Sequence, residues 1–343
     1  MEPLLGKSLP QLQEICAALG MPKFTARQIA QWIYEKRVGS IDGMTNLSKA
    51  HRALLAERYE IGLSAPADRA VSSDGTVKYL FRTATGKLIE TVYIPDGERA
   101  TLCVSSQMGC KMNCLFCQTG KQGFNGNLTT AEILNQIFAV PESQSLTNVV
   151  FMGMGEPLDN PNGLFPALDV MTAPWGMAWS PKRITVSTIG HLPQLPRLLE
   201  EQQCHVAISI HSPFPEERLS LMPVQKAYPI DDVLALLRKY DFSHQRHLTF
   251  EYIVFAGLND DAVHARALIR MLSGLDCKVN LIRFHAIPNV PLQTSETDKM
   301  ERFRDILNRH GITATVRASR GEDIFAACGM LSSLRGEKKN PEL

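Results

Sequence analysis

An alternation of short apolar runs with helical stretches, starting near residue 100, constrains the fold of this chain more than any other feature. Runs such as NVVFMG (148–153), RITVST (183–188) and CHVAISIH (204–211) are each followed by a stretch of helical periodicity. The predicted helices are 129–140, 163–171, 193–201, 230–240, 261–273 and 296–310. Strands that alternate with helices indicate an α/β fold with a parallel sheet, barrel-like or doubly wound. Six or so units are fewer than a closed eight-fold barrel contains.

The regions outside this series have different patterns. Residues 1–70 are predicted to form a small helical domain, with helices at 9–19 and 47–59 and a third between them that Thr25 caps. Residues 71–98 are predicted to form a β-hairpin connector, because TVKYLFRT and KLIETVYI alternate around the turn residues ATG. The predicted core is then 99–330, followed by a polar tail at 331–343.

The bulk composition limits the class of protein. No stretch approaches the roughly 18 apolar residues of a membrane helix, and the N-terminus does not read as a signal peptide. We therefore expect a cytoplasmic protein with reduced thiols, whose eight cysteines indicate metal binding or catalysis. The net charge of +1 gives no global signature of nucleic-acid binding. The basic residues of the N-terminal helices, Arg27 and Lys36 among them, are either a solvated surface or a local nucleic-acid face.

Three of the cysteines fall within the segment GCKMNCLFCQTG (109–120). Cys110, Cys114 and Cys117 form a C-x3-C-x2-C pattern in a loop after a strand. A structural zinc site needs four protein ligands and a catalytic one three, whereas an iron–sulfur cubane prefers thiolates. A cubane held by three thiolates leaves one iron open to a chelating small molecule. The pattern therefore favours a three-cysteine iron–sulfur site, shielded by Phe116, over zinc or buried structural thiols.

Polar residues also gather where the predicted strands end. Gly153 and Gly155 in FMGMGEPLDN allow a bare backbone to approach a ligand, and Glu156 follows as an acceptor. Ser187, Ser209 and His211 end two later strands, which is typical of barrel active sites. Taken singly, each has a simpler interpretation as a turn or a backbone cap. Cys103 and Cys328, read without further context, are small buried hydrophobic residues.

The pattern C-x3-C-x-aromatic-C after the first strand of such a series resembles the radical S-adenosylmethionine (SAM) superfamily. The segments TLCVSSQMGC, CLFCQTGKQGF, MGMGEPL, VSTIG, HSP and RG-x-DI-x-AACG together resemble its RNA adenosine methyltransferases. The resemblance implies a partial (β/α)6 radical SAM barrel and a [4Fe–4S] cluster on the three cysteines. It also implies SAM contacts at Gly155, Glu156, Ser187, Ser209, Ile210, His211 and His285, where His285 replaces the family's asparagine.

The same resemblance implies a role for the two remote thiols. In this family, one SAM places a methyl group on a cysteine, here Cys328, and a second SAM supplies a radical that removes a hydrogen from it. The resulting methylene radical adds to the adenine carbon and joins protein to RNA. A resolving cysteine, here Cys103, then frees the methylated base and leaves a Cys103–Cys328 disulfide. Glu90, in LIETVYIP, matches the acidic residue to which the family assigns the proton at the adenine.

The implied substrates are an adenosine of the peptidyl transferase centre of 23S ribosomal RNA and an anticodon-adjacent adenosine of transfer RNA, methylated at carbon 2. Lys111 and Lys121 are candidate phosphate contacts. We expect a monomer that receives electrons from a flavodoxin- or ferredoxin-type reductant. Three alternatives stay open: methylation at carbon 8, a radical SAM enzyme with another substrate, and a non-catalytic RNA adaptor that binds zinc.

Overall fold

The computed structural model describes residues 1–244 and 246–332, so the predicted tail lies outside the described residues apart from its first two positions. The N-terminal unit is helical, as predicted. It contains α1 (Leu9–Ala18), α2 (Thr25–Ala30), a π-helical turn (Gln31–Glu35) and α3 (Lys49–Ala56). Short strands β1 (Glu2–Pro3) and β2 (Tyr59–Glu60) pair in parallel and close the unit on itself.

The start of α2 differs from the prediction. Thr25 is the first helical residue and is buried, whereas Phe24 occupies the capping position without a side-chain hydrogen bond. The Thr25 N–H donates to the Pro22 carbonyl, so the chain is already turning before Thr25. The predicted Thr25 cap is therefore wrong. Ser8 does cap α1, in a reciprocal capping box with Gln11.

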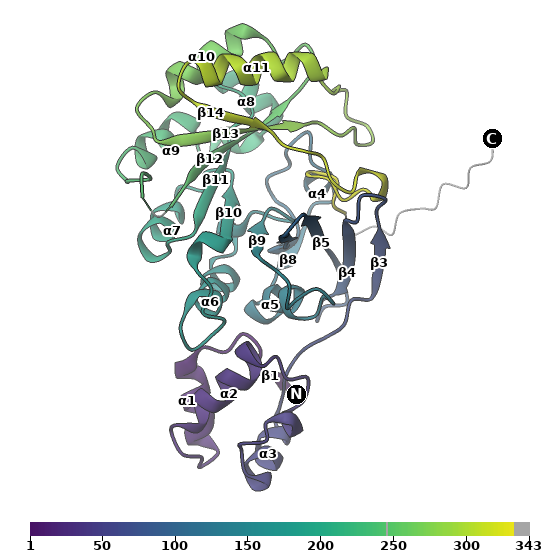
Figure 1. The fold of residues 1–343 in the computed structure, drawn as a ribbon, viewed down its shortest axis with the longest axis vertical. Helices are drawn as coiled ribbons and strands as arrows, with labels where there is room; N and C mark the ends of the chain where they lie inside the picture. The colour runs from purple at the N-terminus through teal and green to yellow at the C-terminus, as the bar shows by residue number, and fades with distance from the viewer. Residues whose placement is uncertain (245, 333–343) are drawn as a thin grey trace, which may run out of the picture.

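The core of the molecule is a ten-stranded sheet, drawn from β3 to β14 in Figure 1. Its strand order is β14-β13-β12-β11-β10-β9-β6-β5-β4-β3. Within this sheet, the seven strands from β14 to β6 in the order just given all pair in parallel, and they form the predicted partial barrel. They are β6 (Arg99–Cys103), β9 (Asn148–Phe151), β10 (Ile184–Thr188), β11 (His205–Ser209), β12 (Leu248–Val254), β13 (Cys277–Arg283) and β14 (Thr313–Val316).

The predicted hairpin extends this sheet in antiparallel fashion. It consists of β4 (Val77–Arg82) and β5 (Leu88–Asp96), and a further strand, β3 (Asp68–Val71), was not predicted. β5 pairs with β6, which places the hairpin directly beside the first barrel strand. Among the described residues β3 and β14 are the two edges, so the sheet stays open.

Helices connect the parallel strands and cover the outer face of the sheet (Figure 1). They are α5 (Thr130–Phe138), α6 (Pro161–Thr172), α7 (Leu195–Glu201), α9 (Ile230–Leu237), α10 (Ala262–Leu272) and α11 (Thr297–Arg309). Phe151, Phe250 and Leu281 lie fully buried in the main apolar cluster. Four short elements were not predicted: β7 (Gln107–Gly109), α4 (Gln118–Lys121), β8 (Phe124–Asn127) and α8 (Pro215–Leu221).

The helix and strand patterns around Cys16, Cys204 and Cys277 predict that these three cysteines are core residues. Cys16 and Cys204 are buried, which agrees with that interpretation. Cys277 is only partly buried, because it is the first residue of β13 and lies at the end of the sheet. Within residues 1–244 and 246–332, no helix has the length and apolarity needed to cross a membrane.

Candidate active site

The three-cysteine loop lies between β7 and α4 and is anchored at several points. The Cys110 N–H donates to the Gly123 carbonyl (3.1 Å), and the Leu115 N–H donates to the Leu221 carbonyl (2.8 Å). Gly109, which precedes the loop, has φ +79°, and a Cβ there would lie 1.8 Å from the Gly123 oxygen. Only glycine fits this position.

Phe116 closes one side of this loop. It is buried, and its ring packs against the rings of His211 (4.7 Å between centroids) and Phe255 (5.8 Å). It belongs with Cys114 to an apolar cluster separate from the main core. The predicted shielding of the cysteines by Phe116 therefore has a structural basis.

The three thiols line one cavity of about 150 Å³. Residues from several strand ends line it too: Gly155, Glu156, Ser187, Ser209, His211 and Cys328. Burial raises the pKa of Cys110 to about 12, and burial reinforced by neighbouring thiols raises the pKa of Cys114 well above its usual value. Cysteines that resist ionisation become thiolates when they bind a cation, since metal binding displaces the protons.

The donor set fits an iron–sulfur cluster, because thiolates are the ligands such clusters prefer. Within the part of the chain that the structure describes, no three His, Cys, Asp or Glu side chains stand close enough to hold a single metal ion. A four-iron cluster is larger than one ion, and its corners are reached by thiols that need not converge on one point. The arrangement suits the cluster better than a mononuclear site.

Gly155 and Glu156 lie together on the wall of this cavity. Gly155 has φ +97°, and a Cβ there would lie 2.4 Å from Cβ of Gln107. The Glu156 carboxylate is buried and accepts hydrogen bonds from the N–H groups of Ile189 (2.9 Å) and Leu158 (3.1 Å). Burial raises the pKa of Glu156 to about 7, against the opposing effect of these bonds. The carboxylate is therefore poised to change charge near neutral pH.

His211 is held from two sides in an unusual backbone conformation, with φ +56°. The Ile253 N–H donates to its Nδ1 (3.0 Å), and the Asn259 side-chain amide donates to its carbonyl (2.7 Å). Because Nδ1 accepts, the neutral ring carries its proton on Nε2. Burial lowers the pKa of His211 to about 3, so the ring stays neutral. His211 thus offers a fixed N–H donor.

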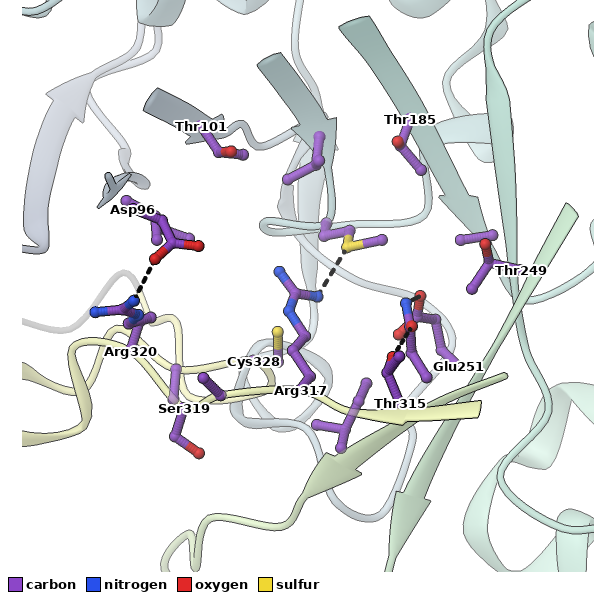
Figure 2. A pocket seen from close by; sticks show the side chains of 18 of the residues that line it. Asp96, Thr101, Thr185, Thr249, Glu251, Thr315, Arg317, Ser319, Arg320 and Cys328 are labelled. Carbon is purple, nitrogen blue, oxygen red and sulfur yellow. Dashed lines mark hydrogen bonds and ion pairs between the residues drawn. The ribbon is translucent and has the colours of Figure 1, made fainter. Parts of the chain in front are cut away.

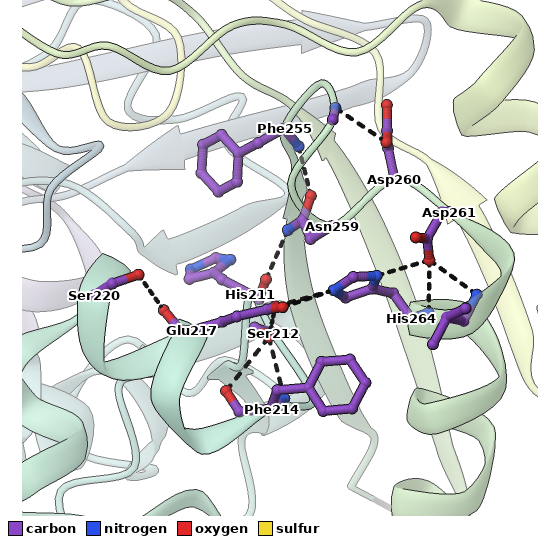
Figure 3. A network of polar contacts seen from close by, with 12 residues as sticks. His211, Ser212, Phe214, Glu217, Ser220, Phe255, Asn259, Asp260, Asp261 and His264 are labelled. Carbon is purple, nitrogen blue, oxygen red and sulfur yellow. Dashed lines mark hydrogen bonds and ion pairs between the residues drawn. The ribbon is translucent and has the colours of Figure 1, made fainter.

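A network of side chains supports the loop that follows His211 (Figure 3). His264 on α10 contacts Asp261 through Nδ1 (2.7 Å) and Glu217 on α8 through Nε2 (2.9 Å). The Ser212 hydroxyl donates to the same Glu217 carboxylate (2.8 Å). The network ties α8 to α10 and fixes the segment between them.

Arg218 is a buried residue of the site that the sequence analysis missed. Its side chain is fully buried, and its guanidinium donates to the carbonyls of Ile189 (3.0 Å) and Ser209 (3.2 Å). It therefore holds the ends of two strands whose residues line the cavity. The segment PEERLSL, which contains it, is short and rich in polar residues, so its periodicity indicated no buried face.

A larger cavity of about 510 Å³ lies inside the partial barrel and meets the smaller one at Cys328. Five residues line both cavities: Met152, Glu251, Ile282, Arg317 and Cys328. Figure 2 shows the larger cavity, with Arg317 and Cys328 close together on one wall. The guanidinium of Arg317 contacts the sulfur of Met152 (3.4 Å). Cys328 therefore faces both the three-cysteine loop and the barrel interior.

Cys103 lies near Cys328, although 225 residues separate them in the sequence. It is the last residue of β6 rather than a mid-strand residue, and it lines neither cavity. Burial, then the charge of Cys328, raises the pKa of Cys103 to about 12, while Arg317 opposes the shift. All eight cysteines lie in the described residues and are free thiols.

The segment that carries Cys328 is bonded to α4, directly after the three-cysteine loop. The Gln118 N–H donates to the Gly329 carbonyl (2.7 Å), and the Thr119 hydroxyl donates to the Leu331 carbonyl (2.8 Å). The C-terminal segment thus reaches back across the barrel and places its thiol beside the smaller cavity.

Besides Cys103, three predicted site residues lie apart from the smaller cavity. Ile210 is fully buried and uses its N–H to bond the Glu251 carbonyl (3.0 Å). His285 lines the larger cavity, where its Nε2 contacts the Ser319 hydroxyl (3.0 Å).

Glu90 is the third of these residues, and it lines neither cavity. Its buried carboxylate contacts Lys78 (2.9 Å) and the Ser332 N–H (2.7 Å). Burial raises the pKa of Glu90, with Lys78 opposing. The roles assigned to Glu90, Ile210 and His285 stay predictions.

Comparison with known proteins decides the family. A probable dual-specificity RNA methyltransferase RlmN from Parabacteroides distasonis is 60% identical over 332 residues, which cover 97% of each chain. The chain belongs to the RlmN family. The RlmN of Marinobacter nauticus is 43% identical, over 96% of this chain and 92% of its own.

Two sequence profiles and a crystal structure agree with this assignment to the RlmN family. The radical SAM superfamily profile matches residues 104–268, and that of the ribosomal RNA large subunit methyltransferase N-terminal domain matches residues 3–61. A radical SAM methyltransferase from Sphaerobacter thermophilus superposes with a TM-score of 0.91 at 40% identity, covering 97% of this chain and 100% of that one.

Membership of the RlmN family confirms several predictions. The chain is a radical SAM RNA methyltransferase that uses a [4Fe–4S] cluster and SAM. The predicted α/β radical SAM fold with an additional N-terminal domain is confirmed. The alternative of a non-catalytic zinc adaptor is wrong, because the RlmN family is a family of enzymes.

Proposed function

We propose that this enzyme methylates carbon 2 of an adenosine in 23S ribosomal RNA and in transfer RNA. The observation that carries the proposal is that Cys328 lines both cavities, with Cys103 and Arg317 as its neighbours. A methyl carrier needs access to the cofactor on one side and to the substrate base on the other. The relatives' name, a dual-specificity RNA methyltransferase, fits two classes of RNA substrate.

The smaller cavity is the proposed cofactor site. Cys110, Cys114 and Cys117 would hold the cluster, which together with SAM supplies a carbon-centred radical. Glu156 in its ionised form would accept hydrogen bonds from the SAM ammonium group, and Gly155 would let the backbone approach it. Ser187, Ser209 and His211 would complete the contacts in this cavity. Ile210 and His285, which lie outside it, would contact the part of SAM that extends beyond the cavity.

The two remote thiols have complementary proposed roles. Cys328 carries the methyl group, and its place at the junction of the cavities lets the sulfur reach the base. Cys103 attacks that sulfur in the resolving step and forms the Cys103–Cys328 disulfide. The bond between the sulfur and the methylene carbon breaks, its electron pair stays with the carbon attached to the base, and a proton completes the methyl group. The attacking group must be a thiolate, but burial opposes ionisation of Cys103. The guanidinium of Arg317 partly offsets that cost, and we propose that it stabilises the thiolate.

Glu90 is the proposed proton acceptor at the adenine. Its ion pair with Lys78 favours the ionised form that a base needs. In this role, the RNA would replace the Ser332 N–H as the partner of one carboxylate oxygen. The position of Glu90 on β5, next to β6 and Cys103, keeps it near the resolving thiol.

The RNA and the other partners complete the proposal. The target adenine leaves its stack to reach a buried site, as bases do in enzymes that modify them. The basic N-terminal helices, together with Lys111 and Lys121, would contact phosphates. We further propose a cytoplasmic monomer that receives electrons from a flavodoxin- or ferredoxin-type protein.

The test uses anaerobically purified enzyme, SAM and substrate RNA, followed by mass spectrometry of the digested nucleosides. Wild type should yield 2-methyladenosine, and 8-methyladenosine in its place would contradict the carbon-2 assignment. Cys328→Ala should keep cluster absorbance yet transfer no methyl group. Cys103→Ala should instead trap RNA covalently on the protein, and normal turnover by this variant would contradict the role of the resolving thiol.

A further inference from the structure

We propose that Glu251 binds an adenosine group at the junction of the two cavities, accepting a hydrogen bond from one of its hydroxyl or amino groups. The side chain is 3% exposed and lines both cavities. Its Oε2 is buried and has no hydrogen-bond partner among the described residues. A buried carboxylate oxygen left unpaired costs free energy, and a ligand that donates to it removes that cost.

Glu251 continues a row of polar residues across four neighbouring strands. In the sheet register Ser209 on β11 pairs with Glu251 on β12, Glu251 with Asn280 on β13, and Asn280 with Thr315 on β14. Register partners on parallel strands project toward the same face of a sheet. The packed interior of a closed barrel carries branched apolar residues at such positions, whereas this row is polar throughout. The row starts at Ser209, a proposed SAM contact.

Hydrogen bonds along this row fix which oxygen of Glu251 is free. The Thr315 hydroxyl donates to Oδ1 of Asn280 (3.0 Å), so the amide group of Asn280 turns its Nδ2 toward Glu251. Nδ2 then donates to Oε1 of Glu251 (2.9 Å). One carboxylate oxygen is thereby occupied and oriented, and Oε2 is left for a ligand. Figure 2 shows Glu251 and Thr315 on the wall that also carries Arg317 and Cys328.

In its ionised form Glu251 presents Oε2 as an acceptor, and the charge of Arg317 favours that form. Burial raises the pKa of Glu251, but the guanidinium of Arg317 and the bond from Asn280 act in the opposite direction. Cys328 and Glu251 both raise the pKa of Arg317, so the thiol, the carboxylate and the guanidinium lie close together. A ligand group that meets Oε2 there must be an O–H or N–H donor close to the methyl carrier.

Adenosine supplies such donors in both reactants of this enzyme. SAM has ribose hydroxyls and an adenine 6-amino group, and the target nucleotide has a 6-amino group and a 2′-hydroxyl. The inference rests on the proposed function, because it takes the smaller cavity as the SAM site and the larger one as the place of the base. It deepens that proposal by adding a residue that recognises the ligand between them.

The experiment measures the affinity of the anaerobic, cluster-loaded enzyme for SAM and, separately, for substrate RNA. Glu251→Gln is nearly isosteric, but glutamine has only one acceptor oxygen, and the Asn280 amide would occupy it. The side-chain nitrogen that replaces Oε2 cannot accept a hydrogen bond from a ligand. We expect a tenfold or greater loss of affinity for one reactant. Glu301→Gln on the exposed side of α11 is the matched control and should leave both affinities unchanged. Loss for SAM places the donor on the adenosine of SAM, and loss for RNA places it on the target nucleotide.

A second measurement removes the hydrogen-bond donor from the ligand, so that the wild-type protein can be tested without a substitution that affects folding. SAM analogues without ribose hydroxyls, and RNA with purine riboside or 2′-deoxyadenosine at the target, are compared on wild type and Glu251→Gln. The analogue that lacks the relevant donor should bind wild type about tenfold more weakly and should bind both proteins equally. Unchanged affinity for both reactants in Glu251→Gln, with full sensitivity to Glu156→Gln, would overturn this inference and leave the proposed function standing. If neither variant alters SAM affinity, the cofactor site itself is misassigned.

Discussion

The side-chain amide of Asn259 donates to the carbonyl of His211 across 2.7 Å, and it also donates to the Ile253 carbonyl and accepts from the Phe255 N–H. Asn259 is fully buried, so these three backbone groups have no access to water. Asn259→Ala should lower the free energy of unfolding by about 2–4 kcal/mol, because it leaves buried polar groups unpaired. It should also weaken SAM binding, since His211 would lose its left-handed conformation.

Chemical denaturation and SAM titration of the cluster-loaded protein check this prediction. Asn162→Ala, at an exposed position at the start of α6, is the control and should change neither quantity. An Asn259→Ala variant with wild-type stability would mean that the network in Figure 3 does not hold the loop.

SAM affinity should depend on pH through Glu156. Its pKa is raised to about 7, so the carboxyl group is largely neutral at pH 6 and ionised at pH 8. The SAM ammonium group binds the ionised form better, and affinity should therefore rise by about tenfold over this interval and then level off. Glu156→Gln should bind SAM weakly at every pH and remove the dependence, whereas an unchanged pH profile in this variant would assign the titration to another group.

The same carboxyl group predicts how stability changes with pH. Its pKa is higher in the folded protein than the usual value of 4.5, so the folded state holds the proton more tightly than the unfolded state does. Stability should therefore fall as pH rises from about 4.5 through 7, and Glu156→Gln should flatten this slope. Equal slopes in wild type and Glu156→Gln, measured by denaturation across that range, would contradict the assignment.

Arg317 should matter for the resolving step. Its guanidinium opposes the raised pKa of Cys103, so its removal should make the attacking thiolate scarcer. In Arg317→Gln we expect covalent RNA–protein adduct to accumulate at neutral pH and to disappear more readily as pH is raised. Denaturing gels of quenched reactions measure the adduct, and Arg266→Gln on the outer face of α10 is the control. Equal amounts of adduct in both variants would rule out this role.

Gly109→Ala tests the anchoring of the three-cysteine loop. A Cβ would lie 1.8 Å from the Gly123 oxygen in a backbone conformation that side chains disfavour, so the loop must move. We expect cluster content to fall by more than half and stability to fall by about 2–4 kcal/mol. Gly86, in the hairpin turn, also has a positive φ, but no atom would contact a Cβ there. Gly86→Ala therefore measures the cost of the backbone conformation alone, and its difference from Gly109→Ala measures the cost of the steric clash. Iron content and absorbance are the measurements.

The sequence predicted the alternating parallel strands and helices well, because each of these segments is long enough to show a strand or helix pattern. RITVST and CHVAISIH became β10 and β11 within a residue or two. The short elements β7, β8 and α8 were missed, since three to seven residues carry little periodic signal. The predicted cap at Thr25 was wrong because a threonine hydroxyl is a common helix cap, whereas here the turn that leads into α2 already begins at Pro22.

The candidate site was predictable where a motif carries it and not elsewhere. Cys110, Cys114 and Cys117 are adjacent in sequence, so their common cavity could be foreseen. Glu251, Arg218 and Asn259 stand alone in apolar or helical surroundings, and only the sheet register and loop packing bring them to the site. The resemblance to a known family linked Cys103 with Cys328, a proximity that no spacing in the sequence encodes.

The hydrogen bonds that join Gln118 to Gly329 and Thr119 to Leu331 have a consequence for how the enzyme matures and ages. The segment bearing Cys328, the proposed methyl carrier, is attached to the short helix α4 that Cys117 precedes, so iron loading and placement of the Cys328 sulfur depend on the same few contacts. Oxygen damage that dismantles the cluster would loosen this attachment as well. An injured molecule would then lose both the cluster and the placement of the Cys328 sulfur beside the smaller cavity.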